Sequence, residues 1–242
     1  MIHLPLRTHG ETAWAGWPKD EGIEALRDPQ IRVFASYVVV FVAAVAINLR
    51  LSTGLPFLDA LTYSAFNFVS IITTTGFATE DYTLWGPFMV ACALVATFLG
   101  GCSGSTSGGV KAYRFVIVAK LLANGIKRLI YPNAVVSVRY GDRLVDEAVQ
   151  HAVVLFISAF VTIWLLLTML LAATGLDILT ALSGALTCLA NVGPGIGDLI
   201  GPAGNFSAVP DAAKWLLALA MLLGRLEILA VLVIASPAFW RR

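Results

Sequence analysis

Two apolar stretches that are too short to cross a membrane each run directly into a glycine-bearing segment. These stretches span residues 58–72 and 176–190, and both lie between longer apolar stretches. A hydrocarbon core is roughly 30 Å thick, so a spanning helix needs about 20 residues. Irregular backbone at membrane depth is tolerated only where protein or a water-filled cavity satisfies its free N–H and C=O groups. The pattern therefore predicts two re-entrant half-helices that line a pore.

The longer apolar stretches predict four transmembrane helices, at residues 33–49, 84–101, 152–173 and 212–235, the second resuming at 113–123 after a break. The chain is 58% hydrophobic and 13% charged, with a mean hydropathy of +0.83. A soluble domain carries roughly 25% charged residues, so that class is excluded. A net charge of +1 also argues against a nucleic-acid partner. We expect an all-α membrane protein in a lipid bilayer.

The charges of the loops predict the orientation of these helices. The side with the half-helices carries two basic residues and these carboxylates: Asp59, Glu80, Asp81, Asp177, Asp198 and Asp211. The opposite side, with both termini and the central connection, holds thirteen Lys and Arg residues. By the positive-inside rule that side is cytoplasmic, and the half-helices enter from outside. The first thirty residues contain no apolar run, so we expect no cleavable signal peptide.

A short internal repeat supports the same arrangement. The string Leu-Asp-Ala-Leu-Thr at 58–62 recurs as Leu-Asp-Ile-Leu-Thr at 176–180, each time at the start of a half-helix. A shared string of this length can arise by coincidence, but its position between two spans and before glycine favours duplication. The predicted unit is helix, half-helix, filter-like segment, helix, used twice in parallel. The predicted divisions are a cytoplasmic segment (1–30), a first pore repeat (31–123), a cytoplasmic connection (124–150) and a second pore repeat (151–242).

The two glycine segments have the composition of an ion filter. In cation filters, backbone carbonyls replace the hydration shell, and glycine adopts the conformations that turn successive carbonyls inward. The segments carry no carboxylate, which suits a monovalent alkali ion better than calcium. The candidate filter residues are Thr74, Thr75, Gly76 and Phe77, with Asn191, Val192 and Gly193. Of these, Thr75, Gly76, Val192 and Gly193 are expected to hold the ion.

A run of small residues interrupts the second predicted span. Such a run cannot remain a lipid-facing helix, so we expect a loop in the pore below the filter. The spacing around Lys111 does not match a phosphate-binding Walker loop. Simple helix packing through small residues is the alternative. The candidate gate comprises Gly100, Gly101, Ser103, Gly104, Ser105, Thr106, Ser107, Gly108 and Gly109, with Lys111.

Two ionisable residues, Arg225 and Glu227, lie inside the last predicted span. Ionisable groups at membrane depth are costly unless they face a cavity or a partner. Arg225 would place a positive charge in the cation path, whereas a structural ion pair is the alternative and suits Glu227 better. The three cysteines lack metal-ligand spacing, and no His, Ser or Cys arrangement supports catalysis, so we expect no enzyme.

Several motifs together resemble the Trk-type bacterial potassium-uptake membrane subunit, of the group that includes the Ktr and HKT transporters. They are the two glycine segments, the loop at 100–111, Tyr-Pro-Asn-Ala-Val at 131–135 and Gly-Arg-Leu-Glu at 224–227. The resemblance implies potassium transport through a pseudo-fourfold pore in the bacterial cytoplasmic membrane. It implies that Gly76 and Gly193 are the filter glycines of the third and fourth repeats, and that Arg225 opposes an intramembrane gate loop.

The resemblance also implies partners: a cytoplasmic nucleotide-binding regulatory subunit and a dimer of membrane subunits. It implies no cofactor in this chain, with K⁺ as the transported ion. Members of the family carry four repeats in one chain, whereas this sequence holds the last two. A complete pore then requires two more repeats, from another chain or from a second copy in a homo-oligomer. The alternatives are a truncated, non-conducting fragment or a secondary transporter, although the latter predicts inverted repeats.

Overall fold

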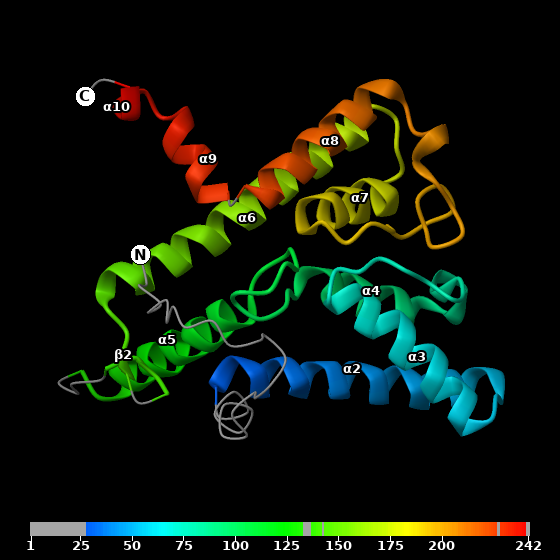
Figure 1. Cartoon of the computed structure of the whole chain (residues 1–242), viewed down its shortest axis with the longest axis horizontal. Helices are drawn as coiled ribbons and strands as arrows, with labels where there is room; N and C mark the ends of the chain where they lie inside the picture. The colour runs from blue at the N-terminus through cyan, green and yellow to red at the C-terminus, as the bar shows by residue number, and fades with distance from the viewer. Residues whose placement is uncertain (1–27, 133–136, 142, 227, 241–242) are drawn as a thin grey trace, which may run out of the picture.

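The computed structural model describes residues 28–132, 137–141, 143–226 and 228–240, whose regular structure is helical apart from one small hairpin (Figure 1). This all-α membrane architecture confirms the expected fold class. The elements are α2 (Pro29–Thr53), α3 (Phe57–Ile72), η1 (Tyr82–Trp85), α4 (Pro87–Phe98), α5 (Ala112–Ile130), β1 (Arg139–Tyr140), β2 (Arg143–Leu144), α6 (Glu147–Ala173), α7 (Ile178–Ala190), η2 (Phe206–Ala208), α8 (Asp211–Arg225), α9 (Ile228–Ala235) and α10 (Pro237–Trp240).

The order of elements in the first half of the chain returns in the second. A long helix (α2 or α6) leads into a short one (α3 or α7), a glycine segment follows, and a broken helix completes the half (α4 and α5, or α8 and α9). In Figure 1, α2 to α5 form the lower part of the molecule, and α6, α7 and α8 form the upper part. Both predicted half-helices are therefore present, and α3 and α7 end at the predicted residues.

Two of the four predicted spans are continuous helices. Among the described residues, α2 and α6 are long and apolar enough to cross a membrane. The second predicted span is broken as expected, because α4 ends at Phe98 and α5 begins at Ala112. Helix α4, the first part of this span, begins at Pro87 and not at residue 84. Gly86 has a φ of 107°, and the residues before it form the 3₁₀ turn η1.

The prediction of one continuous helix over 212–235 was wrong. Helix α8 ends at Arg225, Leu226 caps it, and α9 begins at Ile228. In Figure 1, α9 leaves the line of α8 and turns away from the rest of the molecule. The break follows Gly224, a poor helix former that lies here because a larger residue would collide with α7. Glu227 lies outside the described residues.

The central connection has more structure than its composition suggested. Helix α5 continues to Ile130, past the predicted limit of 123, and strands β1 and β2 pair as an antiparallel hairpin. Lys120 donates a hydrogen bond to the backbone carbonyl of Arg139, which attaches this hairpin to α5. The predicted N-terminal segment, residues 1–30, falls almost entirely outside the described residues.

Both half-helices begin with an aspartate, but only one of these residues is a cap. Asp177 is the N-cap of α7, and its carboxylate accepts the backbone N–H of Thr180 at 3.0 Å. Its hydrogen bonds with Thr180 lower the pKa of Asp177 below the ordinary value. Asp59 lies within the first turn of α3, whose N-cap is Pro56, where a negative charge is favourable for the helix dipole.

The two halves share their cores. Val192 and Ile196, from the second glycine segment, are buried among α2, α3 and α4. Val110, at the end of the loop of the first half, is buried among α6, α7 and α8. Phe98 extends this contact, with its ring 5.4 Å from that of Phe160 on α6. Because each core contains side chains from the other half, the two glycine segments are held in a fixed relation.

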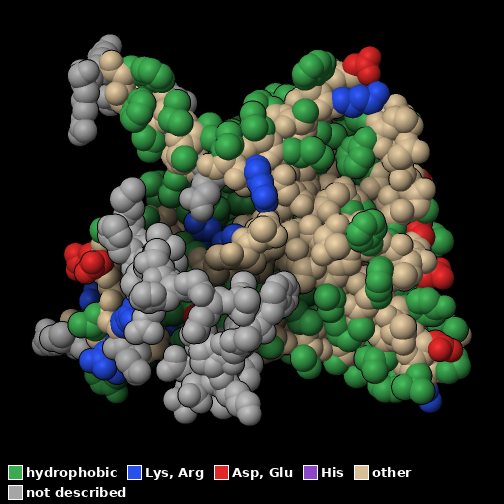
Figure 2. All heavy atoms as spheres, viewed as in Figure 1, with side chains coloured by type: hydrophobic (Ala, Val, Ile, Leu, Met, Phe, Trp, Pro, Cys, Tyr) green, Lys and Arg blue, Asp and Glu red, His purple; other side chains and the backbone are tan. Residues whose placement is uncertain are grey.

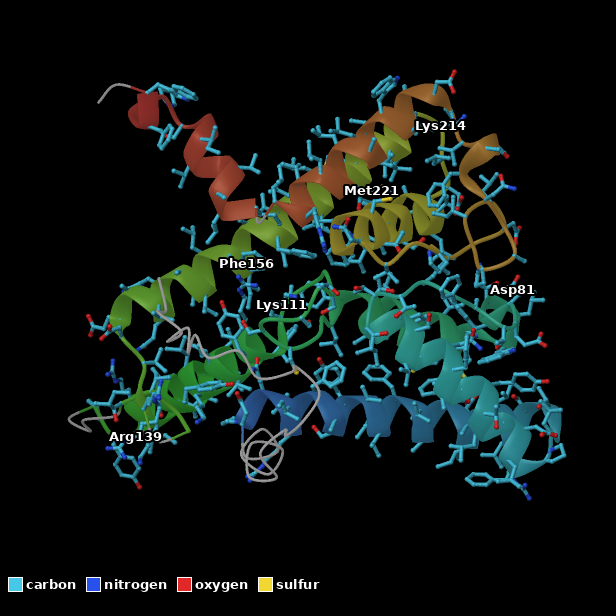
Figure 3. All side chains as sticks on the ribbon, in the orientation of Figure 1. Asp81, Lys111, Arg139, Phe156, Lys214 and Met221 are labelled. Carbon is cyan, nitrogen blue, oxygen red and sulfur yellow. The ribbon has the colours of Figure 1, made fainter. Side chains whose placement is uncertain are left out.

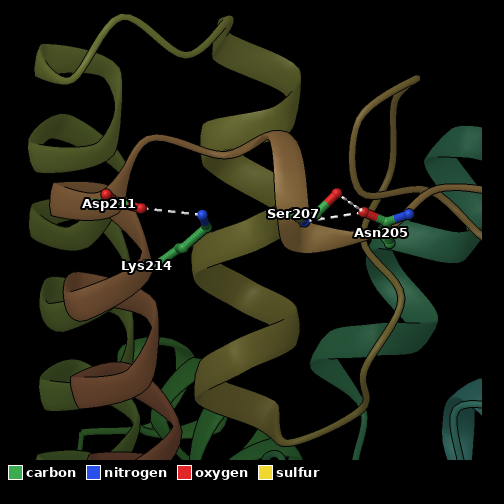
Figure 4. Close-up of polar contacts among 4 residues, drawn as sticks. All are labelled: Asn205, Ser207, Asp211 and Lys214. Atoms are coloured by element: carbon green, nitrogen blue, oxygen red, sulfur yellow. Dashed lines mark hydrogen bonds and ion pairs between the residues drawn. The ribbon is translucent and has the colours of Figure 1, made fainter.

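Charged residues separate along the molecule. Asp81 lies at one end and Arg139 at the other (Figure 3). In Figure 2, most carboxylates in view lie along the right-hand edge, with others at the left, while Lys and Arg side chains lie mostly at the centre and lower left, with others at the upper and lower right. The loop before α8 belongs to the acidic end, where Asp211 forms an exposed ion pair with Lys214 at 3.0 Å (Figure 4). In the same loop the backbone N–H of Ser207 donates to Asn205 at 2.9 Å (Figure 4).

Candidate ion pathway

The first glycine segment turns back from the end of α3. Thr74 and Gly76 both have positive φ, 55° and 81°. The carbonyl of Ser70, in the last turn of the half-helix, accepts the N–H of Thr75 at 2.8 Å and that of Gly76 at 3.4 Å. Thr75 is exposed, and the Phe77 side chain is 71% exposed. Two of its predicted filter residues, Thr75 and Phe77, are therefore on an open side of the chain.

The second segment leaves α7 through a similar turn. Asn191 caps the helix in the left-handed conformation, with a φ of 56°. The carbonyl of Thr187 accepts the N–H of Val192 at 3.0 Å, and Gly193 has a φ of 122°. The amide of Asn191 donates to the carbonyl of Met221 on α8 at 3.3 Å (Met221 in Figure 3). The Asn191 side chain thus attaches the segment to α8.

The two segments touch at their glycines. A Cβ atom on Gly76 would lie 2.2 Å from the carbonyl oxygen of Val192, a separation that van der Waals radii forbid. A Cβ atom on Gly193 would in turn lie 3.8 Å from the Cα of Gly76. Tertiary structure therefore brings together the residues that were predicted to hold an ion. Residue 76 must be glycine for both its positive φ and this close approach.

Polar side chains of the half-helices, which were not among the predicted site residues, hold each segment from the side of its half-helix. In the first half, Asn67 accepts the N–H of Thr79 at 3.1 Å and donates to its hydroxyl at 3.0 Å. In the second half, Ser183 accepts the N–H of Ile196 at 3.0 Å and donates to the carbonyl of Ile196 at 3.0 Å. Both side chains are almost fully buried. Polar residues inside apolar half-helices were the available signal.

The predicted gate residues form a loop that closes on itself. Gly100 donates to the carbonyl of Val110 at 2.9 Å, and Ala112 donates to that of Gly101 at 3.0 Å. At the tip, the hydroxyls of Ser105 and Ser107 lie 2.7 Å apart. The loop therefore begins and ends at one point, between α4 and α5.

The loop lies against the ends of both half-helices. The N–H of Gly108 donates to the hydroxyl of Thr74 at 3.0 Å. A Cβ atom on Gly108 would lie 1.9 Å from the carbonyl oxygen of Ala190, the last residue of α7. The candidate gate and the candidate filter are thus in direct contact.

The positively charged side chains of Lys111 and Arg225 donate hydrogen bonds to three consecutive carbonyls of the loop. Lys111 donates to the carbonyl of Ser105 at 2.9 Å and also to that of Ser107. Arg225, from α8, donates to the carbonyl of Thr106 at 2.8 Å. Figure 3 places Lys111 near the centre of the molecule. The same side chains line a cavity of about 300 Å³, together with Ser103, Gly104, Gly109, Tyr113, Arg114, Phe156 and Gly224.

Hydrogen bonds also connect the loop to the hairpin of the central connection. The hydroxyl of Tyr140 donates to Asp28, which accepts the N–H of Gln30 at 2.9 Å. The Gln30 amide oxygen then accepts the N–H of Ser103 at 2.9 Å. On the other edge of the loop, Tyr37 donates to the carbonyl of Gly100. The loop is therefore attached to α2 and, through Asp28, to β1.

Metal-ligating side chains do not gather within the described part of the chain. No group of three or more His, Cys, Asp or Glu residues lies close enough there to hold a metal ion. Cys92, Cys102 and Cys188 are all free, with Cys188 buried in the core of the second half. The oxygen atoms along the contact between the two glycine segments are backbone carbonyls and threonine hydroxyls.

Comparisons with known proteins identify relatives for this arrangement. The TrkH family model, described as cation transport protein, matches residues 31–242. The potassium uptake protein TrkI of Halomonas elongata is 46% identical over 217 residues, which cover 90% of this chain and 44% of that protein. TrkH of Escherichia coli K12 is 37% identical over 218 residues, with 89% and 44% covered.

A solved structure of a TrkH transporter also matches this chain. The crystal structure of the potassium transporter TrkH from Vibrio parahaemolyticus matches with a TM-score of 0.83 and 36% identity. The match covers 89% of this chain and 46% of that one. The chain thus spans about half the length of the relatives that it matches.

Proposed function

The chain belongs to the TrkH family of cation transport proteins, and we propose that it forms part of a potassium-conducting pore in the bacterial cytoplasmic membrane. Its relatives are named as potassium uptake proteins, and the chain corresponds to about half of each. In this proposal the two halves of the chain supply two of the four repeats that surround the ion. The other two come from a further chain or from a second copy of this one.

The contact between the glycine segments is the observation that carries the proposal. Gly76 meets the carbonyl of Val192, and Thr75 and Gly193 face the open side of the chain. Neutral oxygen dipoles can replace the hydration shell of an alkali ion without a fixed negative charge. In this proposal the carbonyls of Thr75, Gly76, Val192 and Gly193 hold K⁺, and Thr74, Phe77 and Asn191 complete the filter.

The loop between α4 and α5 acts as the gate in this proposal. The N–H of Gly108 in this loop donates to Thr74, and the carbonyls of the loop accept hydrogen bonds from Lys111 and Arg225. Positive charges in a narrow pathway oppose the passage of a cation. In this proposal the arrangement is the closed gate, and opening requires the loop to break its hydrogen bonds with the side chains of Lys111 and Arg225.

The remaining parts of the proposal concern partners and orientation. The basic central connection and both termini face the cytoplasm, where a nucleotide-binding regulatory subunit docks. The acidic end, with Asp81 and Asp211, faces outward and concentrates cations at the mouth of the pore. The predominance of carboxylates at one end and of Lys and Arg toward the other in Figure 2 supports this orientation.

Potassium flux tests the proposal. The assembly that contains this chain is purified intact from its membrane and reconstituted in liposomes, and potassium flux is compared with that of Gly76→Ser. We expect the substitution to abolish flux, because the new Cβ collides with the carbonyl of Val192. Gly54→Ser is the matched control: Gly54 also has positive φ, 72°, but a Cβ there meets nothing within 4 Å.

Two outcomes contradict the proposal. One is absence of flux from an assembly whose composition has been verified, which favours a non-conducting fragment. The other is flux that Gly76→Ser leaves unchanged. Loss of flux in both variants would attribute the effect to backbone strain at a positive φ and not to the filter contact.

A further inference from the structure

Ser70 and Thr187 occupy equivalent places in the two half-helices. Each lies six residues before the glycine of its segment. The carbonyl of Ser70 accepts the N–H of Thr75, and that of Thr187 accepts the N–H of Val192, at 2.8 and 3.0 Å. In both halves these bonds return the chain from the half-helix to the filter segment.

The hydroxyl groups of these two residues are used differently. The Thr187 hydroxyl accepts the N–H of Gly193 at 3.2 Å and donates to the carbonyl of Pro194 at 2.9 Å. The Ser70 hydroxyl is buried and makes no hydrogen bond within the described residues. Thr187 is 1% exposed, so bulk solvent has little access to its hydroxyl. One buried hydroxyl therefore fixes two consecutive residues of the second segment.

This attachment determines where the Val192 carbonyl points. The peptide bonds of the described chain include no cis bond. In a trans peptide the N–H and C=O groups point in opposite directions. Because the N–H of Gly193 points back to Thr187, the C=O of Val192 points away from α7. Its oxygen accordingly lies against Gly76, where a Cβ would approach it to 2.2 Å.

We propose that Thr187 is a positioning residue of the pore, whose hydroxyl sets the direction of the Val192 carbonyl and so the preference of the filter for potassium over sodium. Ser70, its counterpart, has no such role, because its hydroxyl bonds to nothing in the first segment. This inference rests on the proposed function, since it assigns the Val192 carbonyl to an ion. It predicts that the two half-helices respond unequally to removal of equivalent hydroxyls.

Four variants of the intact assembly test the inference by potassium and sodium flux in liposomes. Thr187→Val keeps the shape of the side chain but removes the hydroxyl, and we expect the potassium-to-sodium ratio to fall about tenfold. Thr187→Ser restores the hydroxyl and should restore the ratio. Ser70→Ala should leave the ratio unchanged.

Thr168→Val is the matched control for folding. Thr168 is also buried, at 5% exposed, but its hydroxyl donates only to the carbonyl of Trp164 in its own helix. We expect this variant to keep both the assembly and the ratio. An unchanged ratio in Thr187→Val, or an equal loss in Ser70→Ala, would overturn the inference.

Hydrogen exchange separates this inference from the proposed function. In the wild-type assembly the N–H of Gly193 should be protected, and Thr187→Val but not Thr187→Ser should lose that protection. If the wild-type assembly passes no potassium, the proposed function fails while the exchange experiment still decides whether Thr187 positions the segment. Equal protection in the wild type and Thr187→Val contradicts the positioning role in either case.

Discussion

The two halves of the chain contact the end of α7 differently. The first half reaches it with the loop between α4 and α5, whereas the second half packs helix α8 directly against it. Gly108 of the loop meets the carbonyl of Ala190, and Gly224 of α8 meets that of Leu189. Both contacts fall on α7, and each would place a Cβ only 1.9 Å from a carbonyl oxygen. The end of α7 is thus held by both halves of the chain.

The comparison extends to the way in which each segment is fixed. Equivalent backbone bonds return both segments from their half-helices, but different side chains hold them: Asn67 in the first, Ser183 and Thr187 in the second. Corresponding elements of the two halves therefore share a backbone path but are held by different side chains. In the proposed pore, the first half supplies the movable gate and the second supplies the fixed support.

The largest expected effect concerns the support from α8. Gly224→Ala places a methyl group against the carbonyl of Leu189 and should destabilise the assembly by about 3 kcal/mol. The matched control is Gly125→Ala: Gly125 is also helical, in α5, but a Cβ there meets nothing within 4 Å. That control should be neutral or stabilising by up to about 1 kcal/mol. Thermal unfolding in mild detergent measures both, and equal stability of the two variants would remove the proposed support role.

The next effect concerns the gate. Arg225→Met removes the hydrogen bond to the carbonyl of Thr106, a bond to a charged donor worth about 1.5 kcal/mol. Loss of that bond should favour the open loop and raise potassium leak about tenfold. Lys214→Met is the control, because Lys214 forms only an exposed pair with Asp211 within the described residues. A leak that Arg225→Met leaves at the wild-type level would show that Arg225 does not hold the gate closed.

The smallest effect distinguishes the starts of the half-helices. Asp177→Ala removes the N-cap of α7 and should cost about 1 kcal/mol. Asp59→Ala should cost only about 0.3 kcal/mol, because Asp59 interacts with the dipole of α3 without capping it. Urea unfolding of the two variants measures the difference, and equal losses would contradict the distinct roles of the two aspartates.

Asp177 should also make the stability of the assembly depend on pH. The folded-state pKa of Asp177 is lowered by its bonds with Thr180, so its contribution to stability is present above the unfolded pKa, near 4. The contribution is lost as pH falls through the folded value. The stability difference between wild type and Asp177→Ala should therefore shrink below about pH 4. A difference that persists in acid would mean that the charge of Asp177 contributes nothing.

Much of the fold could be predicted from the sequence, because the length of an apolar stretch and its glycine content determine locally where a helix forms and where it ends. The half-helices, the break before Ala112 and the glycine segments are all present as expected. The kink after Arg225 was missed, because the stretch 212–235 is apolar enough for one span. The hairpin at Arg139–Leu144 was missed because two-residue strands leave no periodic pattern.

The candidate site divides in the same way. The sequence by itself indicated the candidate filter segments, because each combines glycine with polar residues, carries no carboxylate and follows an apolar stretch too short to span. Only the tertiary structure decided that Gly76 meets Val192, that the loop rests on α7 and that the hydroxyl of Thr187, unlike that of Ser70, bonds to a segment. The reason is physical: hydrogen bonds and close approaches between distant residues depend on ångström-scale geometry that no local pattern records.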